Sequence, residues 1–170
     1  MTNASPDAAP GEVRLRAVQD ADLPILFEQQ LDPVATQMAA FPSRDHQAFM
    51  AHWARVRADP TNILLTILYD GQVAGNLGCW EQDGARVVGY WLGRPYWGRG
   101  IATRALAAFL AQMPTRPVVA YVVRHNVASQ RVLEKCGFTR CETDPLAPPA
   151  AEHDEEVKLI LRAHDPAIAS

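Results

Sequence analysis

The stretch from Gly89 to Leu106, GYWLGRPYWGRGIATRAL, constrains the fold of this chain more than any other segment. It opens with apolar and aromatic residues typical of a strand, crosses a segment that contains Gly93, Gly98 and Gly100, and continues in a helical pattern. A helix that begins directly after a glycine loop leaves its first backbone N–H groups without partners. These groups and the positive end of the helix dipole point at whatever lies in front. The sequence therefore predicts a phosphate site at this helix start.

Positive side chains surround the same helix start, at Arg94, Arg99 and Arg104. Guanidinium groups bind phosphate through paired N–H donors, so this loop favours a diphosphate over a neutral ligand. Solvated surface charge is a fair alternative explanation for Arg104 and a poorer one for Arg99.

Two common phosphate motifs do not fit the loop. A nucleotide P-loop needs a lysine and a Ser or Thr after its second glycine, whereas Arg99 and Gly100 follow Gly98 here. A dinucleotide site needs a third glycine, but that position is Thr103, and it needs an acidic residue after the next strand, which instead ends at Arg124. The diphosphate must belong to another kind of ligand.

The length and composition predict one globular domain. The chain has 170 residues, 48% of them hydrophobic, and a net charge of -3, so no general field attracts nucleic acid or anionic lipid. We expect a mobile tail over residues 1–12, a single domain over 13–162 and a C-terminal tail over 163–170. Three cysteines without CxxC spacing predict free thiols and no metal site. No apolar run reaches the length of a membrane span, and no signal peptide is evident, so we expect a cytoplasmic protein.

The first half of the chain reads as a strand, two helices and a meander. The strand covers 13–18, a helix follows Asp20, Asp32-Pro33 breaks it, and Ser43 is a plausible cap for a second main helix. Asp70-Gly71 is a strong hairpin signal between residues 62–69 and 72–80. A turn at 82–84 then leads into the strand 85–93 that meets the glycine loop.

The second half predicts a crossover. The apolar run 118–123 reads as a strand buried on both faces and parallel to 85–92. A helix capped by Asn126 and ended by Gly137 follows it. The remaining elements are a strand over 138–143, a proline-rich loop and a last strand over 155–163.

A three-strand meander, WGRGIA, a helix, a parallel strand and the pattern N-x-x-S-x-x-x-x-x-K-x-GF resemble the GNAT acetyltransferase superfamily. Details such as GYWL and HNVASQRVLEKCGF look like the branch that contains the RimJ/RimL ribosomal-protein N-terminal acetyltransferases. The resemblance implies an α+β fold with a mixed, mostly antiparallel seven-stranded sheet. One parallel strand pair would be splayed around the CoA arm, and helices would cover both faces.

The activity implied is transfer of an acetyl group from acetyl-CoA to a primary amine of a small molecule or a protein N-terminus. In such enzymes the loop amides hold the pyrophosphate and the end of the preceding strand pairs with the pantetheine arm. The residues matched to the cofactor are Trp91, Leu92, Arg94, Trp97, Gly98, Arg99, Gly100, Ile101, Ala102, Thr103, Asn126, Ser129 and Lys135.

The chemistry needs an oxyanion donor, a group for the leaving thiolate and a neutral amine. The resemblance assigns the oxyanion to the backbone N–H of Leu92. Many relatives use a tyrosine for the thiolate, four residues beyond the position of Ser129, but Leu133 stands there. Ser129 is therefore the candidate donor. Asn126 is equally well explained as a helix cap and as a pantetheine ligand.

The general base and the acceptor site are less constrained. Glu142 is the carboxylate we name as catalytic, with Glu81, Glu155 and Glu156 as alternatives, and water is a further route for the proton. Trp80 and Tyr90, beside Trp91, are expected to wall the acceptor pocket. A lone His125 reads as a surface or capping residue. A non-catalytic acetyl-CoA sensor stays open as the alternative function, and the assembly is a monomer or a homodimer.

Overall fold

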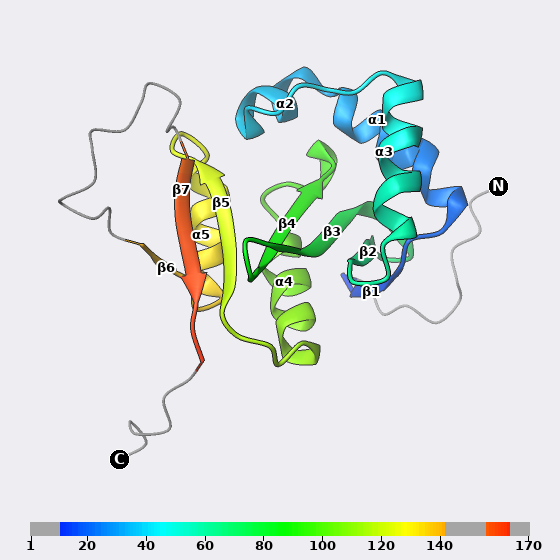
Figure 1. Cartoon of the computed structure of the whole chain (residues 1–170). Coiled ribbons are helices and arrows are strands. Elements are labelled where there is room, and N and C mark those ends of the chain that lie inside the picture. The colour runs from blue at the N-terminus through cyan, green and yellow to red at the C-terminus, as the bar shows by residue number, and fades with distance from the viewer. Residues whose placement is uncertain (1–10, 142–155, 164–170) are drawn as a thin grey trace, which may run out of the picture.

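The protein is described by a computed structural model over residues 11–141 and 156–163 (Figure 1). A seven-stranded sheet in the order β1-β2-β3-β4-β5-β7-β6 forms its centre. Every neighbouring pair is antiparallel except β4 and β5, which confirms the expected mixed sheet. The strands are β1 Val13–Ala17, β2 Ile63–Tyr69, β3 Gln72–Gln82, β4 Ala85–Leu92, β5 Val118–Val123, β6 Thr139–Arg140 and β7 Glu156–Leu161.

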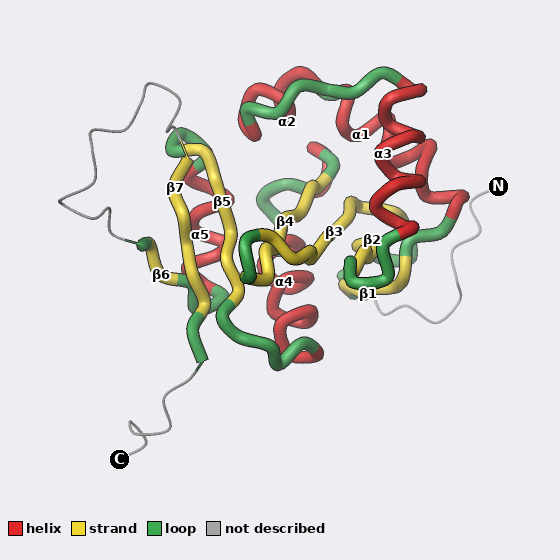
Figure 2. The backbone as a smooth tube through the Cα atoms, in the orientation of Figure 1, coloured by secondary structure: helices red, strands yellow, loops and turns green. Residues whose placement is uncertain are grey.

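Helices cover both faces of the sheet, as expected (Figures 1 and 2). The helices are α1 Leu23–Leu31, α2 Pro33–Ala39, α3 His46–Ala58, α4 Ile101–Gln112 and α5 Val127–Lys135, with short 3-10 turns η1 Asp20–Asp22 and η2 Arg94–Tyr96. The main core joins the sheet to α4 and α5 through residues such as Leu106, Phe109 and Leu133. A smaller cluster under α1 and α3 contains Leu26 and Trp53. None of the helices in the described ranges is both long and apolar enough to cross a membrane.

The parallel strands β4 and β5 pair over a very short distance. Only Arg86 with Val118 and Val87 with Val119 are in register. Beyond these pairs the two strands diverge, and Figure 2 shows the gap that opens toward the end of β4. The sheet is therefore continuous at one end of β4 and split at the other, which confirms the splay that the sequence implied.

A bulge in β3 shapes the end of β4. The register between β2 and β3 shifts at Ile67 and Leu68, which leaves Ala74 out of the ladder. The carbonyl of Ala74 then accepts a 2.8 Å hydrogen bond from the N–H of Gly93. A Cβ atom on Gly75 would lie 2.0 Å from the carbonyl oxygen of Trp91, so only glycine allows this approach.

Three local expectations were wrong or incomplete. Asp45, not Ser43, caps α3, because its carboxylate accepts from the N–H of Ala48 at 2.8 Å. The segment after Pro33 is a helix, α2, which begins where the proline needs no N–H partner. Tyr121 of β5 is 42% exposed, because α1 and α3 pack over β2 and β3 and leave this face of β5 uncovered. Residues 142 and 143 of the expected sixth strand lie outside the described residues.

Candidate active site

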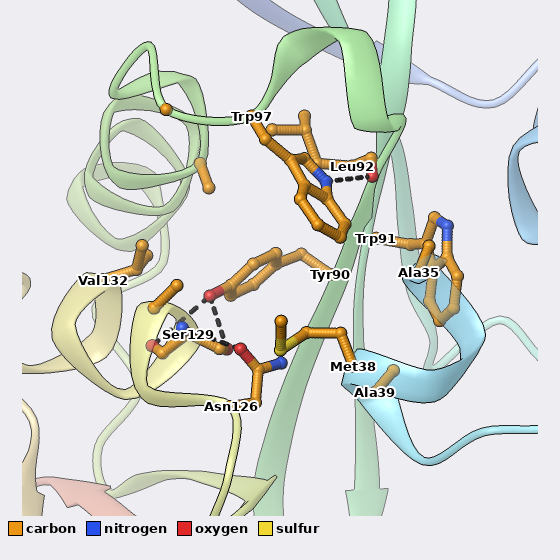
Figure 3. Close-up of a pocket in the computed structure, with 13 residues that line it drawn as sticks. Ala35, Met38, Ala39, Tyr90, Trp91, Leu92, Trp97, Asn126, Ser129 and Val132 are labelled. Carbon is orange, nitrogen blue, oxygen red and sulfur yellow. Dashed lines mark hydrogen bonds between the residues drawn. The ribbon is translucent and has the colours of Figure 1, made fainter. Parts of the chain in front are cut away.

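A cavity of about 220 Å³ lies where β4 and β5 diverge (Figure 3). Its walls come from α2, the end of β4, the loop after η2, and the first turns of α4 and α5. The walls are mainly apolar, and hydroxyl, amide and indole groups supply the polar atoms. The lining residues are Ala35, Met38, Ala39, Tyr90, Trp91, Leu92, Trp97, Gly98, Ala102, Asn126, Ala128, Ser129 and Val132.

The end of β4 presents backbone groups to the cavity. The N–H of Gly93 points to β3, where it donates to Ala74. Successive N–H groups of an extended strand point to opposite edges, so the N–H of Leu92 is directed toward the gap beside β5. The carbonyl of Leu92 accepts a 2.8 Å hydrogen bond from Nε1 of Trp97, which fixes the loop to the strand. This arrangement leaves a backbone donor at the cavity without needing a side chain.

The loop before α4 is built for an anion. Gly98 and Gly100 have φ angles of 71° and 72°, a left-handed conformation that glycine adopts without strain. Gly100 immediately precedes α4 as its N-cap residue, and its carbonyl accepts the first helical hydrogen bond, from the N–H of Arg104. The N–H groups of residues 101–103 precede that bond and stay free for a ligand. The loop therefore has the backbone geometry that the predicted phosphate site requires.

The first turn of α5 brings a hydroxyl to the cavity. Asn126 accepts the N–H of Ser129 at 3.2 Å, so it is the helix cap that the sequence predicted. Asn126 also lines the cavity, which keeps ligand contact open beside capping. The hydroxyl oxygen of Ser129 lies 2.7 Å from that of Tyr90 on β4 (Figure 3). Burial raises the pKa of Tyr90 to about 12, although the hydrogen bond with Ser129 offsets part of this effect.

Helix α2 closes the cavity on the side opposite α5 (Figure 3). Ala35, Met38 and Ala39 give this wall small and apolar side chains. His125 Nε2 lies 3.0 Å from the carbonyl oxygen of Gln37, so α2 contacts the turn between β5 and α5. The sequence signal for this wall was the pair Asp32-Pro33, a cap followed by a helix-starting proline.

A sequence profile of the acetyltransferase (GNAT) domain matches residues 12–139, about three quarters of the chain. The chain belongs to the GNAT acetyltransferase family. Acetyl-CoA is the acetyl donor of this family. No curated protein matched the sequence in a separate search.

Solved GNAT structures share the fold at low sequence identity. RimL, a ribosomal L7/L12 α-N-protein acetyltransferase in complex with CoA, is 20% identical and has a TM-score of 0.72 over 89% of this chain and 94% of its own. RimJ of Mycobacterium smegmatis is 22% identical, with a TM-score of 0.71 over 90% and 83%. Spermidine N-acetyltransferase of Vibrio cholerae is 13% identical, with a TM-score of 0.71 over 87% and 93%. The fold agrees with relatives whose acceptors differ.

Most residues matched to CoA in this GNAT domain gather at the cavity. The cavity is lined by seven of them, namely Trp91, Leu92, Trp97, Gly98, Ala102, Asn126 and Ser129. Gly100 and Thr103 belong to the loop and first helical turn, and Ile101 supplies a backbone N–H while its side chain is buried in the core.

The charged residues predicted for CoA do not line the cavity. Arg94 pairs with Asp32 at 3.0 Å, and the guanidinium of Arg99 lies 5.8 Å from the ring centre of Tyr69. Both are exposed beside the loop. Lys135 is exposed in the last turn of α5, outside the set of lining residues.

The two residues predicted to wall the acceptor pocket lie in different places. Tyr90 lines the cavity, whereas Trp80 does not. A Cβ atom on Gly89 would lie 3.1 Å from Cη2 of Trp80, so this indole packs over β4 on the face that Trp91 shares. The contact between Tyr90 and Ser129 was missed because it joins residues 39 positions apart in the sequence.

The carboxylates considered as the general base also lie in different parts of the chain. Glu81 stands opposite Arg86 near the hairpin, about 20 Å along the strand from Leu92. Glu156 borders a second hollow, which it shares with Tyr90 and Ser129. Glu142 and Glu155 lie outside the described residues. Within the described ranges, no three His, Cys, Asp or Glu side chains form a group that could hold a metal ion.

Proposed function

We propose that this chain transfers the acetyl group of acetyl-CoA to a primary amine that enters the cavity between β4 and β5. The main support is that three kinds of group meet at one cavity: the backbone of Leu92, the free N–H groups after Gly100 and the hydroxyl of Ser129. A pyrophosphate at the α4 start places the CoA arm along the gap, so its thioester comes to the end of β4. The second hollow, which Glu156 borders, includes Ser129 but neither Leu92 nor the glycine loop.

The cavity supports direct transfer. The amine nitrogen attacks the thioester carbonyl carbon, and the N–H of Leu92 donates to the oxygen on which negative charge develops. When the tetrahedral intermediate collapses, the C–S bond breaks and its electron pair goes to sulfur. Ser129 then donates a hydrogen bond from its hydroxyl to the thiolate. The amine loses its proton to water. Glu156 borders a hollow that includes Ser129, which keeps it as an alternative base, and Glu142 stays a prediction.

The side of the cavity formed by α2 is the proposed approach for the acceptor. Ala35, Met38 and Ala39 line it without charge, opposite the helix that carries Ser129. An acceptor molecule that carries an apolar group beside its amine would bury that group against this wall. The burial stabilises the complex in proportion to the apolar area removed from water. The acceptor can be a small molecule or a protein N-terminus.

An acceptor screen tests the proposal. The wild-type protein is incubated with acetyl-CoA and a panel of amines, and released CoA is detected as free thiol. We expect turnover, one CoA site per chain by calorimetry, and a higher Tm with acetyl-CoA. Absence of CoA binding at millimolar concentration would refute the proposal.

A non-catalytic acetyl-CoA sensor is the second candidate. It is favoured by Leu133, which is 1% exposed in the core and fills the position where many relatives have a tyrosine. CoA binding without turnover toward any amine would support the sensor. Turnover that Ser129→Ala abolishes, with CoA affinity retained, would exclude it.

Location and assembly complete the proposal. Cys79, Cys136 and Cys141 are free thiols, as suits a reducing compartment, so we place the protein in the cytoplasm. Strands β1 and β6 are the edges of the sheet. We propose a monomer or a homodimer, without a nucleic-acid partner, and sedimentation measures which form exists.

A further inference from the structure

The helix that carries Ser129 has no second hydroxyl facing the cavity one turn further on. That position is Leu133, which packs in the main core. Among the described residues that line the cavity, Tyr90 carries the only phenol. It comes from a different element, β4, on the other side of the gap. The phenol at this site is therefore supplied by the sheet and not by the helix.

Tyr90 and Ser129 contact each other directly. Their hydroxyl oxygens lie 2.7 Å apart, a normal length for an O–H···O hydrogen bond. The backbone carbonyl of Ser129 lies 3.5 Å from the tyrosine oxygen, a much weaker alternative acceptor. Figure 3 shows the phenol reaching across the gap to the first turn of α5. The serine is thus held from both sides, by Tyr90 at its hydroxyl and by Asn126 at its N–H.

Each hydroxyl has one hydrogen, and this fixes what the pair can do. When Tyr90 donates to Ser129 Oγ, the serine hydrogen must point elsewhere, and the cavity offers the free direction. Burial raises the pKa of Tyr90 to about 12, so the phenol keeps its proton at neutral pH and can donate at all times. A serine without this partner would turn among its rotamers and bond to backbone carbonyls of its own helix.

We propose that Tyr90 is a positioning residue, which holds Ser129 in the rotamer that directs the serine hydrogen at the departing thiolate of CoA. This inference rests on the proposed function. Tyr90 acts through Ser129 and does not touch the sulfur. Sequence reasoning had placed its ring in the wall of the acceptor pocket.

The proton of Tyr90 stays on Tyr90 during the reaction. Passing it through Ser129 to a thiolate would turn a phenol with a pKa of about 12 into a phenolate. A thiol has a pKa near ~8.5, so such a relay runs roughly three orders of magnitude uphill. The hydrogen bond from Ser129 stabilises the thiolate, while the proton lost by the attacking nitrogen goes to water. The bonds balance because the N–C bond forms as the C–S bond breaks.

A double-mutant cycle tests this role in the full-length protein. Tyr90→Phe, Ser129→Ala and the double variant are assayed with acetyl-CoA and an amine that the screen shows to be a substrate. Ser129→Ala should lower kcat about a hundredfold. Tyr90→Phe should lower kcat by about fivefold, the effect of one lost hydrogen bond, and leave the CoA Kd and the acceptor KM within about twofold. The double variant should match Ser129→Ala, because Tyr90 has no target once the hydroxyl is gone.

Tyr96→Phe is the matched control. Its ring packs against Tyr69 with centroids 6.2 Å apart, and it does not line the cavity. This variant should keep the wild-type kcat, and thermal melts should show that every variant is folded.

Two results would overturn the inference while the proposed function stands. One is an unchanged kcat in Tyr90→Phe. The other is a pair of effects that multiply in the double variant, since independent effects mean that Tyr90 does not act through Ser129. A wild-type protein that binds no CoA and acetylates no amine would instead contradict the proposed function, and the inference would fail with it.

Discussion

Trp97 donates a 2.8 Å hydrogen bond from its indole Nε1 to the carbonyl of Leu92 and so fixes the glycine loop to the end of β4. The bond joins the two parts of the chain that we propose bind one CoA molecule, the loop at the pyrophosphate and the strand at the thioester. Their spacing is therefore set before the donor binds.

Trp97→Phe keeps an aromatic ring in the cavity and removes the donor. One hydrogen bond contributes about 1 kcal/mol, so CoA affinity should fall about fivefold in calorimetry. Trp80→Phe is the control, because its Nε1 reaches only Gln82 at 3.3 Å outside the cavity. Equal CoA affinity in both variants would contradict the role of the bond.

Gly100→Ala should weaken both folding and CoA binding. Its φ of 72° costs an alanine about 1–2 kcal/mol, although a Cβ would meet nothing within 4 Å. Gly84 in the β3–β4 turn has the same kind of backbone, φ 76°, and equally open space, so Gly84→Ala is a matched control. Urea unfolding should show similar losses for both variants, whereas calorimetry should show weaker CoA binding for Gly100→Ala alone. A normal CoA affinity in Gly100→Ala would argue against this loop as the phosphate site.

Gly75→Ala should be far more damaging than Gly78→Ala. The new Cβ would lie 2.0 Å from the carbonyl oxygen of Trp91, so the end of β4 must move away from β3. Overpacking against backbone should cost about 3 kcal/mol or more and reduce turnover. At Gly78 the nearest atom would be 3.6 Å away, an ordinary contact, and the cost should stay below about 1 kcal/mol. Chemical unfolding measures the free energy of unfolding of both variants. Equal losses in the two variants would contradict the importance of the close approach at Gly75.

Met38→Glu should change the acceptor and not the donor. A hydrated carboxylate on the α2 wall removes apolar contact, so the KM of an amine with an apolar neighbouring group should rise roughly tenfold. The CoA Kd should stay within about twofold. Met50→Glu, on an exposed position of α3 outside the cavity, is the control. A change in CoA affinity with an unchanged acceptor KM would mean that α2 borders the donor instead.

Acid should destabilise the protein through Asp22. Burial would raise the pKa of this carboxyl, but hydrogen bonds from Arg16, the N–H of Gln19 and Thr66 outweigh burial and lower the pKa to about 2. A folded-state pKa below the unfolded value of ~3.9 means that the folded protein binds fewer protons. This stabilisation, about 2 kcal/mol, is complete above about pH 4 and is lost as the pH falls toward 2.

Unfolding by urea at a series of pH values measures that loss. Asp22→Asn cannot titrate at this position, so it should be less stable at neutral pH and should lose less stability between pH 4 and pH 2. Parallel stability curves for the variant and the wild-type protein would contradict the assignment.

The sequence predicted those features that depend on local signals. The glycine loop, the hairpin at Asp70-Gly71 and the cap at Asn126 each arise from a few adjacent residues with restricted backbone preferences. The splay of β4 from β5 followed from the family resemblance, because a run of apolar residues such as 118–123 does not show where pairing stops.

The features that were missed depend on geometry between distant segments. Tyr90 and Trp91 are adjacent in a strand, so their side chains leave on opposite faces. Trp80 packs on the face of Trp91, so it does not form one aromatic wall with Tyr90. That alternation was readable in the sequence. The 2.7 Å contact of Tyr90 with Ser129 was not, because it depends on how far α5 stands from β4 after the strands diverge.

The short parallel pairing also bears on how the fold responds to its donor. Between β4 and β5, backbone hydrogen bonding in register stops after Val87 and Val119. Beyond that point, the two portions of the sheet are joined across the gap by side-chain packing and by whatever occupies it. A bound CoA arm would serve as a spacer between them, so the amides along the inner edges of both strands should exchange with solvent deuterium more slowly in the donor complex. Donor binding should therefore also make the sheet more rigid along these two strands.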